Sequence, residues 1–208
     1  QASLTSKASI HVNQLFAHTY QDELIKLISH NDPENQLQIQ QKMNKTFFNL
    51  TGYMLVDRTG DILFQYGPPL AQNEAQLVKK SANKSDLSSR FFAHYYGEQG
   101  GFYSITWFEH DNQLYGFIVR RPFNKFSEMI YNGGFEGYQL ALYDQEQKEV
   151  LITEKHYHSD QSAVDLESII NRVSYRRKIA ATPWELIAIK NPNYLRNALW
   201  NIILPSLV

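Results

Sequence analysis

The first fifty residues carry the hydrophobic spacing of helices. Between residues 8 and 30, apolar side chains recur every three or four positions, which predicts one amphipathic helix. Asp32-Pro33 then supplies a capping residue and a first-turn proline for a second helix, which we expect to end near Leu50. Both helices have polar backs, so we predict that residues 1–50 form a helical stalk and not a globular core.

After Thr51 the pattern changes to short apolar runs separated by turn residues, which is typical of strands paired in hairpins. Four hairpins are predicted, at 53–66, 102–120, 137–153 and 175–189. Helices are favoured between them, at 70–80, 86–97 and 162–173. This alternation of paired strands and helices indicates an α+β fold.

The order hairpin, helix, hairpin occurs twice along the chain. Gly52-Tyr53 and Gly137-Tyr138 open the two copies, and Asp57 and Asp144 stand at corresponding hairpin turns. We therefore predict two tandem lobes after the N-terminal helices, each an antiparallel sheet with helices on one face. The expected bounds are 51–131 for the first lobe, 132–192 for the second, and 193–208 for a return segment. A single sheet with long insertions is the alternative.

Composition narrows the possible functions. The chain has 208 residues, 43% of them hydrophobic, which is enough for a sizeable core. Twenty Lys plus Arg residues nearly balance 21 Asp plus Glu residues, so there is no basic surplus of the kind that nucleic-acid binding requires. Cysteine is absent, which excludes disulfides, thiolate metal sites and cysteine nucleophiles.

The end of the sequence becomes almost wholly apolar. Residues 198–208 place Trp200 before a run of aliphatic side chains, a pattern that is typical of the interfacial start of a membrane helix. A C-terminal segment packed on the core is the alternative. Because the chain starts with Gln1, we expect further sequence upstream, and we expect membrane helices to flank these residues on both sides.

Sequence signatures of catalysis and of metal binding are missing. There is no Gly-x-Ser-x-Gly elbow, phosphate loop or dinucleotide fingerprint. His156-Tyr157-His158 would place two imidazoles on one face of a strand, but only Glu154 and Asp160 are at hand as further ligands. We expect no catalytic residue, no metal and no cofactor, and we interpret this His pair as a polar strand end.

Aromatic and arginine side chains are concentrated between Arg90 and Arg121. Small-molecule sites combine aromatic walls with a few fixed polar groups, and Arg binds carboxylates through two parallel hydrogen bonds. Because side chains alternate along strand 102–108, only one set can line a pocket, and the alternative is an aromatic sheet core. The candidate ligand-binding residues are Arg90, Tyr96, Tyr103, Trp107, Tyr115 and Arg120.

Two segments carry a family resemblance. After the opening helices, the run Val56-Asp57-Arg58-Thr59-Gly60-Asp61-Ile62-Leu63 has a strand, an acidic residue, a turn with glycine and a second strand. Pro183-Trp184-Glu185-Leu186-Ile187-Ala188-Ile189 looks like a last core strand. Together they resemble the PAS-like extracytoplasmic sensors of the PDC or Cache group, in a double-lobed arrangement.

This resemblance implies a non-enzymatic periplasmic sensor domain of an inner-membrane receptor. Such a domain recognises a small molecule, forms homodimers through its N-terminal helices, and signals to a GGDEF or EAL domain, a histidine kinase or a chemotaxis domain. The amino-acid-binding members carry a Tyr, Arg, Trp-Tyr pattern. Arg90, Tyr95, Tyr96 and Trp107 are of the right types but at different spacing, so no ligand identity is carried over. A protein-interaction module without a small-molecule ligand is the alternative, and a secreted enzyme of unrecognised type is a third possibility.

Overall fold

The fold was analysed in a computed structural model. It describes residues 2–29, 33–47, 49–70, 72–82, 90–96, 99–123, 128, 130, 137–153 and 171–190. Internal contacts divide the chain into two units, residues 1–123 with 180–182, and residues 124–179 with 183–208. The predicted helix 162–173 and the return segment 193–208 lie largely or wholly outside the described residues, and so does the histidine pair. The predicted lobe boundary at 131/132 stays a prediction.

The N-terminal region contains three helices, α1 (Ala2–Thr19), α2 (Gln21–Ser29) and α3 (Pro33–Thr46). The single helix predicted over 8–30 is interrupted at Tyr20, although hydrogen bonds from Tyr20 N to Phe16 O and from Leu24 N to Tyr20 O keep the helical spacing. The helix that starts at Pro33 ends at Thr46, earlier than predicted, and Asn49 follows in the left-handed region with φ of 56°. Asparagine tolerates this conformation better than most residues, so it suits a chain reversal.

The first unit is built on a five-stranded antiparallel sheet in the order β2-β1-β5-β4-β3. The strands are β1 (Gly52–Val56), β2 (Ile62–Tyr66), β3 (Arg90–Tyr96), β4 (Gln99–His110) and β5 (Gln113–Pro122). The two predicted hairpins are confirmed as β1-β2 and β4-β5. The helix predicted over 86–97 is wrong, because residues 90–96 form β3 and pair along β4 from Arg90↔Ile105 to Tyr96↔Gln99.

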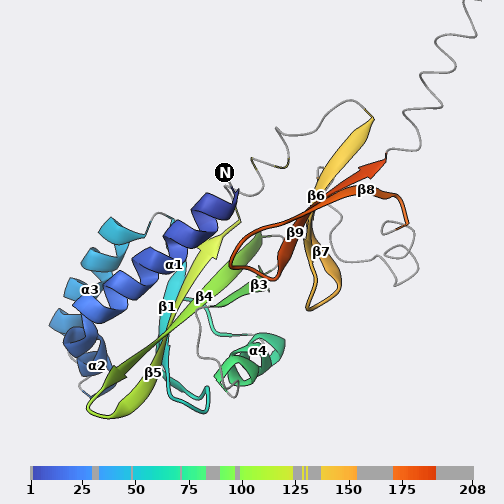
Figure 1. The fold of residues 1–208 in the computed structure, drawn as a ribbon. Coiled ribbons are helices and arrows are strands. Elements are labelled where there is room, and N and C mark those ends of the chain that lie inside the picture. The colour runs from blue at the N-terminus through green and yellow to red at the C-terminus, as the bar shows by residue number, and fades with distance from the viewer. Residues whose placement is uncertain are drawn as a thin grey trace, which may run out of the picture. The chain divides into compact units, whose positions relative to one another are not determined.

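Both faces of this first sheet are covered, as Figure 1 shows, with α1, α2 and α3 on one side and α4 (Gln72–Ala82) on the other. One core cluster joins the N-terminal helices to the sheet through Phe16, Leu24, Met43, Phe47 and Phe117. Stacking of Phe16 on Phe117, with ring centroids 5.6 Å apart, lies within this cluster. The structure therefore differs from the expected stalk without a globular core, because the apolar stripe of the helices is buried on the sheet.

The second unit contains a four-stranded antiparallel sheet in the order β7-β6-β9-β8. Its strands are β6 (Tyr138–Asp144), β7 (Glu149–Thr153), β8 (Val173–Lys178) and β9 (Trp184–Lys190). They confirm the third and fourth predicted hairpins. This order matches the order β2-β1-β5-β4 of four strands in the first unit. The two tandem lobes stay a prediction. The described strands form two sheets, so the single-sheet alternative is wrong.

The two aspartates of the repeat have the same structural role. The Asp57 carboxylate accepts hydrogen bonds from the backbone N–H of Thr59 at 2.8 Å and of Asp61 at 2.9 Å. Asp144 accepts from the backbone N–H of Glu146 at 2.8 Å and of Gln147 at 3.0 Å. Each aspartate thus closes the turn that follows its strand, which is why an acidic residue recurs at this position.

Asp144 also binds across its sheet. Its second carboxylate oxygen accepts a hydrogen bond of 3.1 Å from the indole N–H of Trp184, whose side chain is fully buried. Burial raises the pKa of Asp144, although the hydrogen bonds to its carboxylate act in the opposite direction. This contact ties the end of β6 to the start of β9.

Candidate functional site

The candidate site is the layer between α4 and the first sheet. Strand alternation points Tyr103 and Trp107 of β4 toward this layer, and cross-strand pairing puts Arg120 of β5 beside Tyr103. Arg90 of β3 pairs with Ile105, which belongs to the same apolar cluster. Four of the six sequence-predicted residues therefore share this face of the sheet.

The helix that covers this face brings two polar residues into the layer. The sheet-facing stripe of α4 has helical spacing and consists of Glu74, Leu77, Val78, Ser81 and Ala82. Glu74 is 3% exposed and Ser81 is 2% exposed, so both are as buried as the apolar residues around them. Sequence analysis did not identify either residue, although their places in an otherwise apolar stripe of a helix were a usable signal.

Polar contacts join the sheet to α4 and to the segment before this helix. The Tyr103 hydroxyl donates a hydrogen bond of 3.1 Å to the Glu74 carboxylate, and the Arg120 guanidinium donates one of 3.2 Å to the carbonyl oxygen of Pro68. The Arg120 guanidinium also lies 5.5 Å from the centre of the Tyr103 ring, a favourable cation–π arrangement. Burial raises the pKa of Tyr103 to about 12, so its hydroxyl is a neutral donor at physiological pH.

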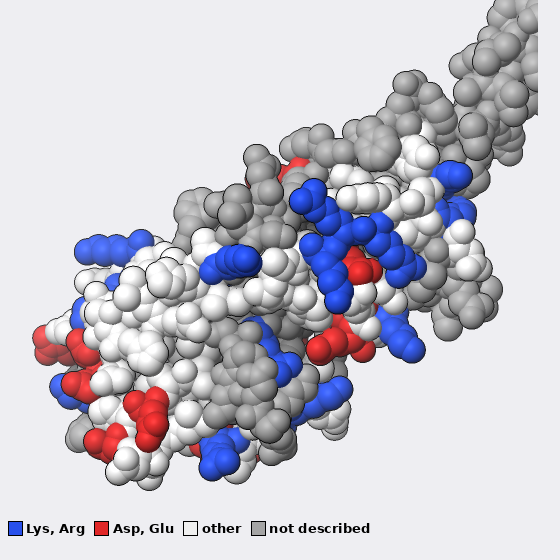
Figure 2. Space-filling view, in the orientation of Figure 1, with Lys and Arg blue, Asp and Glu red and all other residues white. Residues whose placement is uncertain are grey.

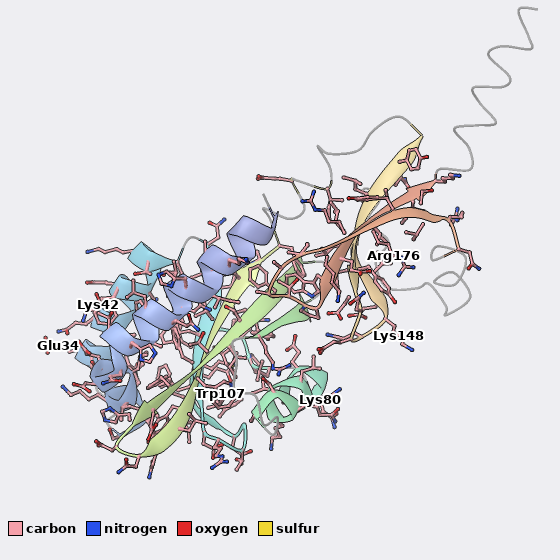
Figure 3. The ribbon with its side chains drawn as sticks, in the orientation of Figure 1. Glu34, Lys42, Lys80, Trp107, Lys148 and Arg176 are labelled. Carbon is pink, nitrogen blue, oxygen red and sulfur yellow. The ribbon has the colours of Figure 1, made fainter. Side chains whose placement is uncertain are left out.

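Trp107 lies farther along the same strand. It is four residues from Tyr103 on β4, so their Cα atoms are about 13 Å apart at a rise of about 3.3 Å per residue. Gly116, its partner on β5, leaves space for the indole, because a Cβ atom there would lie 3.0 Å from a Trp107 ring carbon and 2.6 Å from Val56 Cγ2. Figure 3 labels Trp107 on the sheet.

The indole of Trp107 has an unsatisfied hydrogen-bond donor. Its Nε1 is buried and has no partner among the described residues, and the same holds for the Ser81 hydroxyl. The other described tryptophan, Trp184, donates to Asp144. A buried polar group without a partner costs about 1–3 kcal/mol, so the layer contains two groups that a bound molecule could satisfy.

Two predicted residues do not join this group. Tyr115 belongs to the opposite face of the sheet, where its ring stacks on Phe108 with centroids 5.8 Å apart. The backbone of Tyr96 is in β3, but its side chain lies outside the described residues. No cluster of three metal-ligating side chains occurs in the part of the chain that the structure describes.

A surface groove of about 760 Å³ lies at the hairpin tips of the first unit. Its walls come from the end of α2, the β1-β2 turn and the β4-β5 hairpin, and Tyr115 is among its lining residues. Ile28, Leu63 and Leu114 supply apolar surface, and Asp57 and Glu109 supply carboxylates. Leu114 both lines this groove and packs against the apolar cluster of the α4 layer.

A further buried polar cluster joins α1 to the opposite face of the first sheet. The Asn13 side chain donates a hydrogen bond to the Ser104 hydroxyl, and Arg121 Nη2 lies 3.5 Å from the same oxygen. The Arg121 guanidinium is also 5.1 Å from the centre of the Phe102 ring. Burial lowers the pKa of Arg121 to about 10. These contacts fix the position of α1 on β4 and β5.

Comparison with known proteins gives no sequence relative. No family model matches the sequence, and no curated protein matches it. Among the described residues, no helix is long and apolar enough to cross a membrane.

Solved structures nevertheless share the fold. The ligand-binding domain of the amino acid chemoreceptor PctC of Pseudomonas aeruginosa, in complex with GABA, is 10% identical with a TM-score of 0.56, over 90% of this chain and 96% of that chain. The periplasmic domain of Vibrio cholerae LuxQ is 13% identical with a TM-score of 0.53, over 92% and 94%. A domain of a sensory box/GGDEF family protein from Vibrio parahaemolyticus is 7% identical with a TM-score of 0.53, over 94% and 100%.

The chain has the fold of extracytoplasmic sensor domains. The match extends over 90–94% of this chain, so it includes residues of both units. The predicted α+β architecture with PAS-like sheets is thereby confirmed.

Proposed function

We propose that this chain is the periplasmic sensory domain of an inner-membrane signal-transduction receptor, and that it binds a small molecule between α4 and the first sheet. The domain itself is not an enzyme. Its signal passes across the membrane to a GGDEF or EAL, histidine kinase or chemotaxis output. The fold shared with sensor domains of chemoreceptors and of a GGDEF protein supports this role.

The buried indole N–H of Trp107 is the observation that carries the ligand site. A protein core normally pairs such donors, and the Ser81 hydroxyl in the same layer is also unsatisfied by the described residues. Tyr103, Glu74 and Arg120 provide a fixed polar end about 13 Å away. We therefore propose a ligand with a hydrogen-bond acceptor for Trp107, held with its polar groups toward Arg120.

A fluorescence titration tests this site. Amino acids, carboxylates, amines and purines are screened for an increase in melting temperature and a change in tryptophan emission. A hydrogen bond contributes about 1 kcal/mol, so Trp107→Phe should weaken a true ligand about five-fold, and Ser81→Ala should have a comparable effect. The matched control is Trp184→Phe, which removes a buried indole from the other unit. A ligand that binds both site variants as tightly as the wild type would refute this location.

The groove at the hairpin tips favours a second function, docking of a periplasmic protein. The edge strand β2 lies next to this groove. Its side chains Ile62, Leu63 and Tyr66 are 42%, 37% and 39% exposed. Apolar residues on an unpaired edge are a common site of protein association. A photo-crosslinking residue in place of Leu63 in the intact receptor should yield a partner adduct, and the same residue in place of Lys45 should not.

We also propose a homodimer formed through the N-terminal helices. Their apolar stripe is used against the sheet, but Leu15 of α1 and Leu37 of α3 remain exposed, at 59% and 55%. These residues provide apolar contact surface for a second copy.

A further inference from the structure

Positive charge is concentrated on one edge of the second sheet. β8 is the last strand in the order β7-β6-β9-β8, and it is exposed from Ser174 to Lys178. Figure 2 shows Lys and Arg side chains gathered over this sheet. Five cations, here called the basic edge, belong to β8, to the residue before it and to the end of the neighbouring strand β9. They are Arg172, Arg176, Arg177, Lys178 and Lys190.

Only part of this charge is used inside the second unit. Arg176, labelled in Figure 3, lies 3.7 Å from the buried Glu185 carboxylate, and its guanidinium is 5.8 Å from the centre of the Tyr143 ring. Arg177 and Lys178 are exposed and form no ion pair with any described residue. These two cations are therefore available to a partner, whereas Arg176 also supports the sheet.

The arrangement of the basic edge suits an extended surface better than a small ligand. Side chains alternate along β8, so Arg177 points to one side of the sheet while Arg176 and Lys178 point to the other. They flank a strand that is about 20 Å long and exposed from Ser174 to Lys178. Tyr175 stands beside them with 58% of its surface exposed. Tyrosine next to cations is frequent where proteins meet the membrane–water interface.

We propose that the basic edge binds anionic phospholipid headgroups of the membrane that holds the receptor. This inference rests on the proposed function. A second copy is disfavoured as the occupant, because pairing two β8 edges would bring like charges together. Each Lys or Arg near an anionic membrane surface contributes about 1 kcal/mol of binding, so even the unpaired cations give a measurable affinity.

The chain itself brings this edge within reach of the bilayer. β9 pairs with β8 along its length and ends at Lys190. The apolar segment that is predicted to approach the membrane begins at Ala198, eight residues later, and eight residues span at most about 29 Å. Arg177 pairs with Leu186, which lies four residues before Lys190, or about 13 Å along the strand. Arg177 therefore lies within about 42 Å, along the extended chain, of the start of this segment.

Vesicle co-sedimentation of the purified 208-residue chain tests the proposal. Vesicles of phosphatidylcholine alone are compared with vesicles containing about one quarter phosphatidylglycerol. Binding should be stronger to the anionic vesicles and should fall as salt is raised. The double variant Arg177→Gln/Lys178→Gln should bind anionic vesicles about 25-fold more weakly, or about five-fold for each charge. The control Lys45→Gln/Lys80→Gln makes the same change in net charge on exposed lysines of the first unit and should stay within about two-fold of the wild type.

Four results would overturn the proposal. The wild type could fail to bind anionic vesicles, or could bind neutral vesicles equally well. The control variant could lose as much binding as Arg177→Gln/Lys178→Gln. The wild type could bind soluble polyglutamate more tightly than vesicles, which would indicate an acidic protein partner. Circular dichroism verifies that both double variants are folded. The small-molecule titration with Trp107→Phe uses the same protein. If the chain binds a small molecule but not the anionic vesicles, the lipid proposal is refuted and the proposed sensory function stands.

Discussion

Asp57 and Asp144 each close a hairpin turn, but Asp57 accepts hydrogen bonds with one carboxylate oxygen and Asp144 with both. This difference allows a test of the hydrogen-bond geometry. In the first unit, one oxygen of Asp57 accepts every recorded bond, from Thr59 N at 2.8 Å, Thr59 Oγ1 at 2.7 Å and Asp61 N at 2.9 Å. In the second unit, Asp144 uses both oxygens. One accepts the two backbone N–H groups of the turn, and the other accepts the indole N–H of Trp184.

Substitution by asparagine separates the two cases. The Asn amide has one acceptor oxygen, which is enough for Asp57→Asn to retain all three bonds. In Asp144→Asn, either the turn amides or the indole N–H must face the NH₂ group, so one buried donor is left opposite another donor. Leaving a buried donor unsatisfied costs about 1–3 kcal/mol, and we expect a loss of about 2 kcal/mol for Asp144→Asn. We expect less than about 0.5 kcal/mol for Asp57→Asn, in keeping with surface substitutions.

Urea unfolding, followed by circular dichroism and by tryptophan fluorescence, measures both variants at neutral pH. The free energy of unfolding is compared at equal m-values, because a changed slope would mean a changed denatured state or separate unfolding of the two units. The indole of Trp184 reports directly on the second unit. Equal losses in the two variants, or a larger loss in Asp57→Asn, would refute the assignment of acceptors.

Three further predictions follow from packing, charge and exposure. Gly116→Ala places a Cβ 2.6 Å from Val56 Cγ2 and should destabilise the first unit by about 1–3 kcal/mol in urea unfolding, whereas unchanged stability would mean that the layer has spare room. Burial raises the pKa of both Asp144 and Glu149, so their stabilising effect is present below their unfolded pKa values and is lost as pH rises through the raised folded values. Hydrogen exchange, corrected for its intrinsic rate, should therefore show better protection of β6 and β9 at mildly acidic pH than at pH 7, and the reverse order would contradict this sign. Leu15→Glu should shift the chain from dimer to monomer in light scattering after gel filtration, and a monomeric wild type would contradict the proposed dimer.

Local features of the sequence determined the hairpins. Turn residues and two-residue alternation act over fewer than ten positions, and all four predicted hairpins are present because nothing distant is needed to specify them. The repeat of Asp57 and Asp144 was visible for the same reason, since each carboxylate bonds to the turn that follows it. Strand alternation also placed Tyr103 and Trp107 together on one face of β4.

The tertiary structure decided what depends on distant partners. Residues 90–96 include four aromatic side chains, which favour strands, and β4 offers the segment a ladder of backbone hydrogen bonds. The apolar stripe of the N-terminal helices could have faced a partner chain, and only packing shows that Phe16 and Phe47 meet Phe117 of the sheet. In the candidate site, Glu74 comes from a helix that covers the sheet, so no pattern along the chain places its carboxylate beside Tyr103. Tyr115 pairs with Phe108, and paired residues on neighbouring strands lie on the same face of a sheet. Because Phe108 is next to Trp107 along β4, it points to the opposite face, and so does Tyr115. Sequence periodicity therefore specifies elements and faces, while the pairing of elements that are far apart in the chain specifies the site.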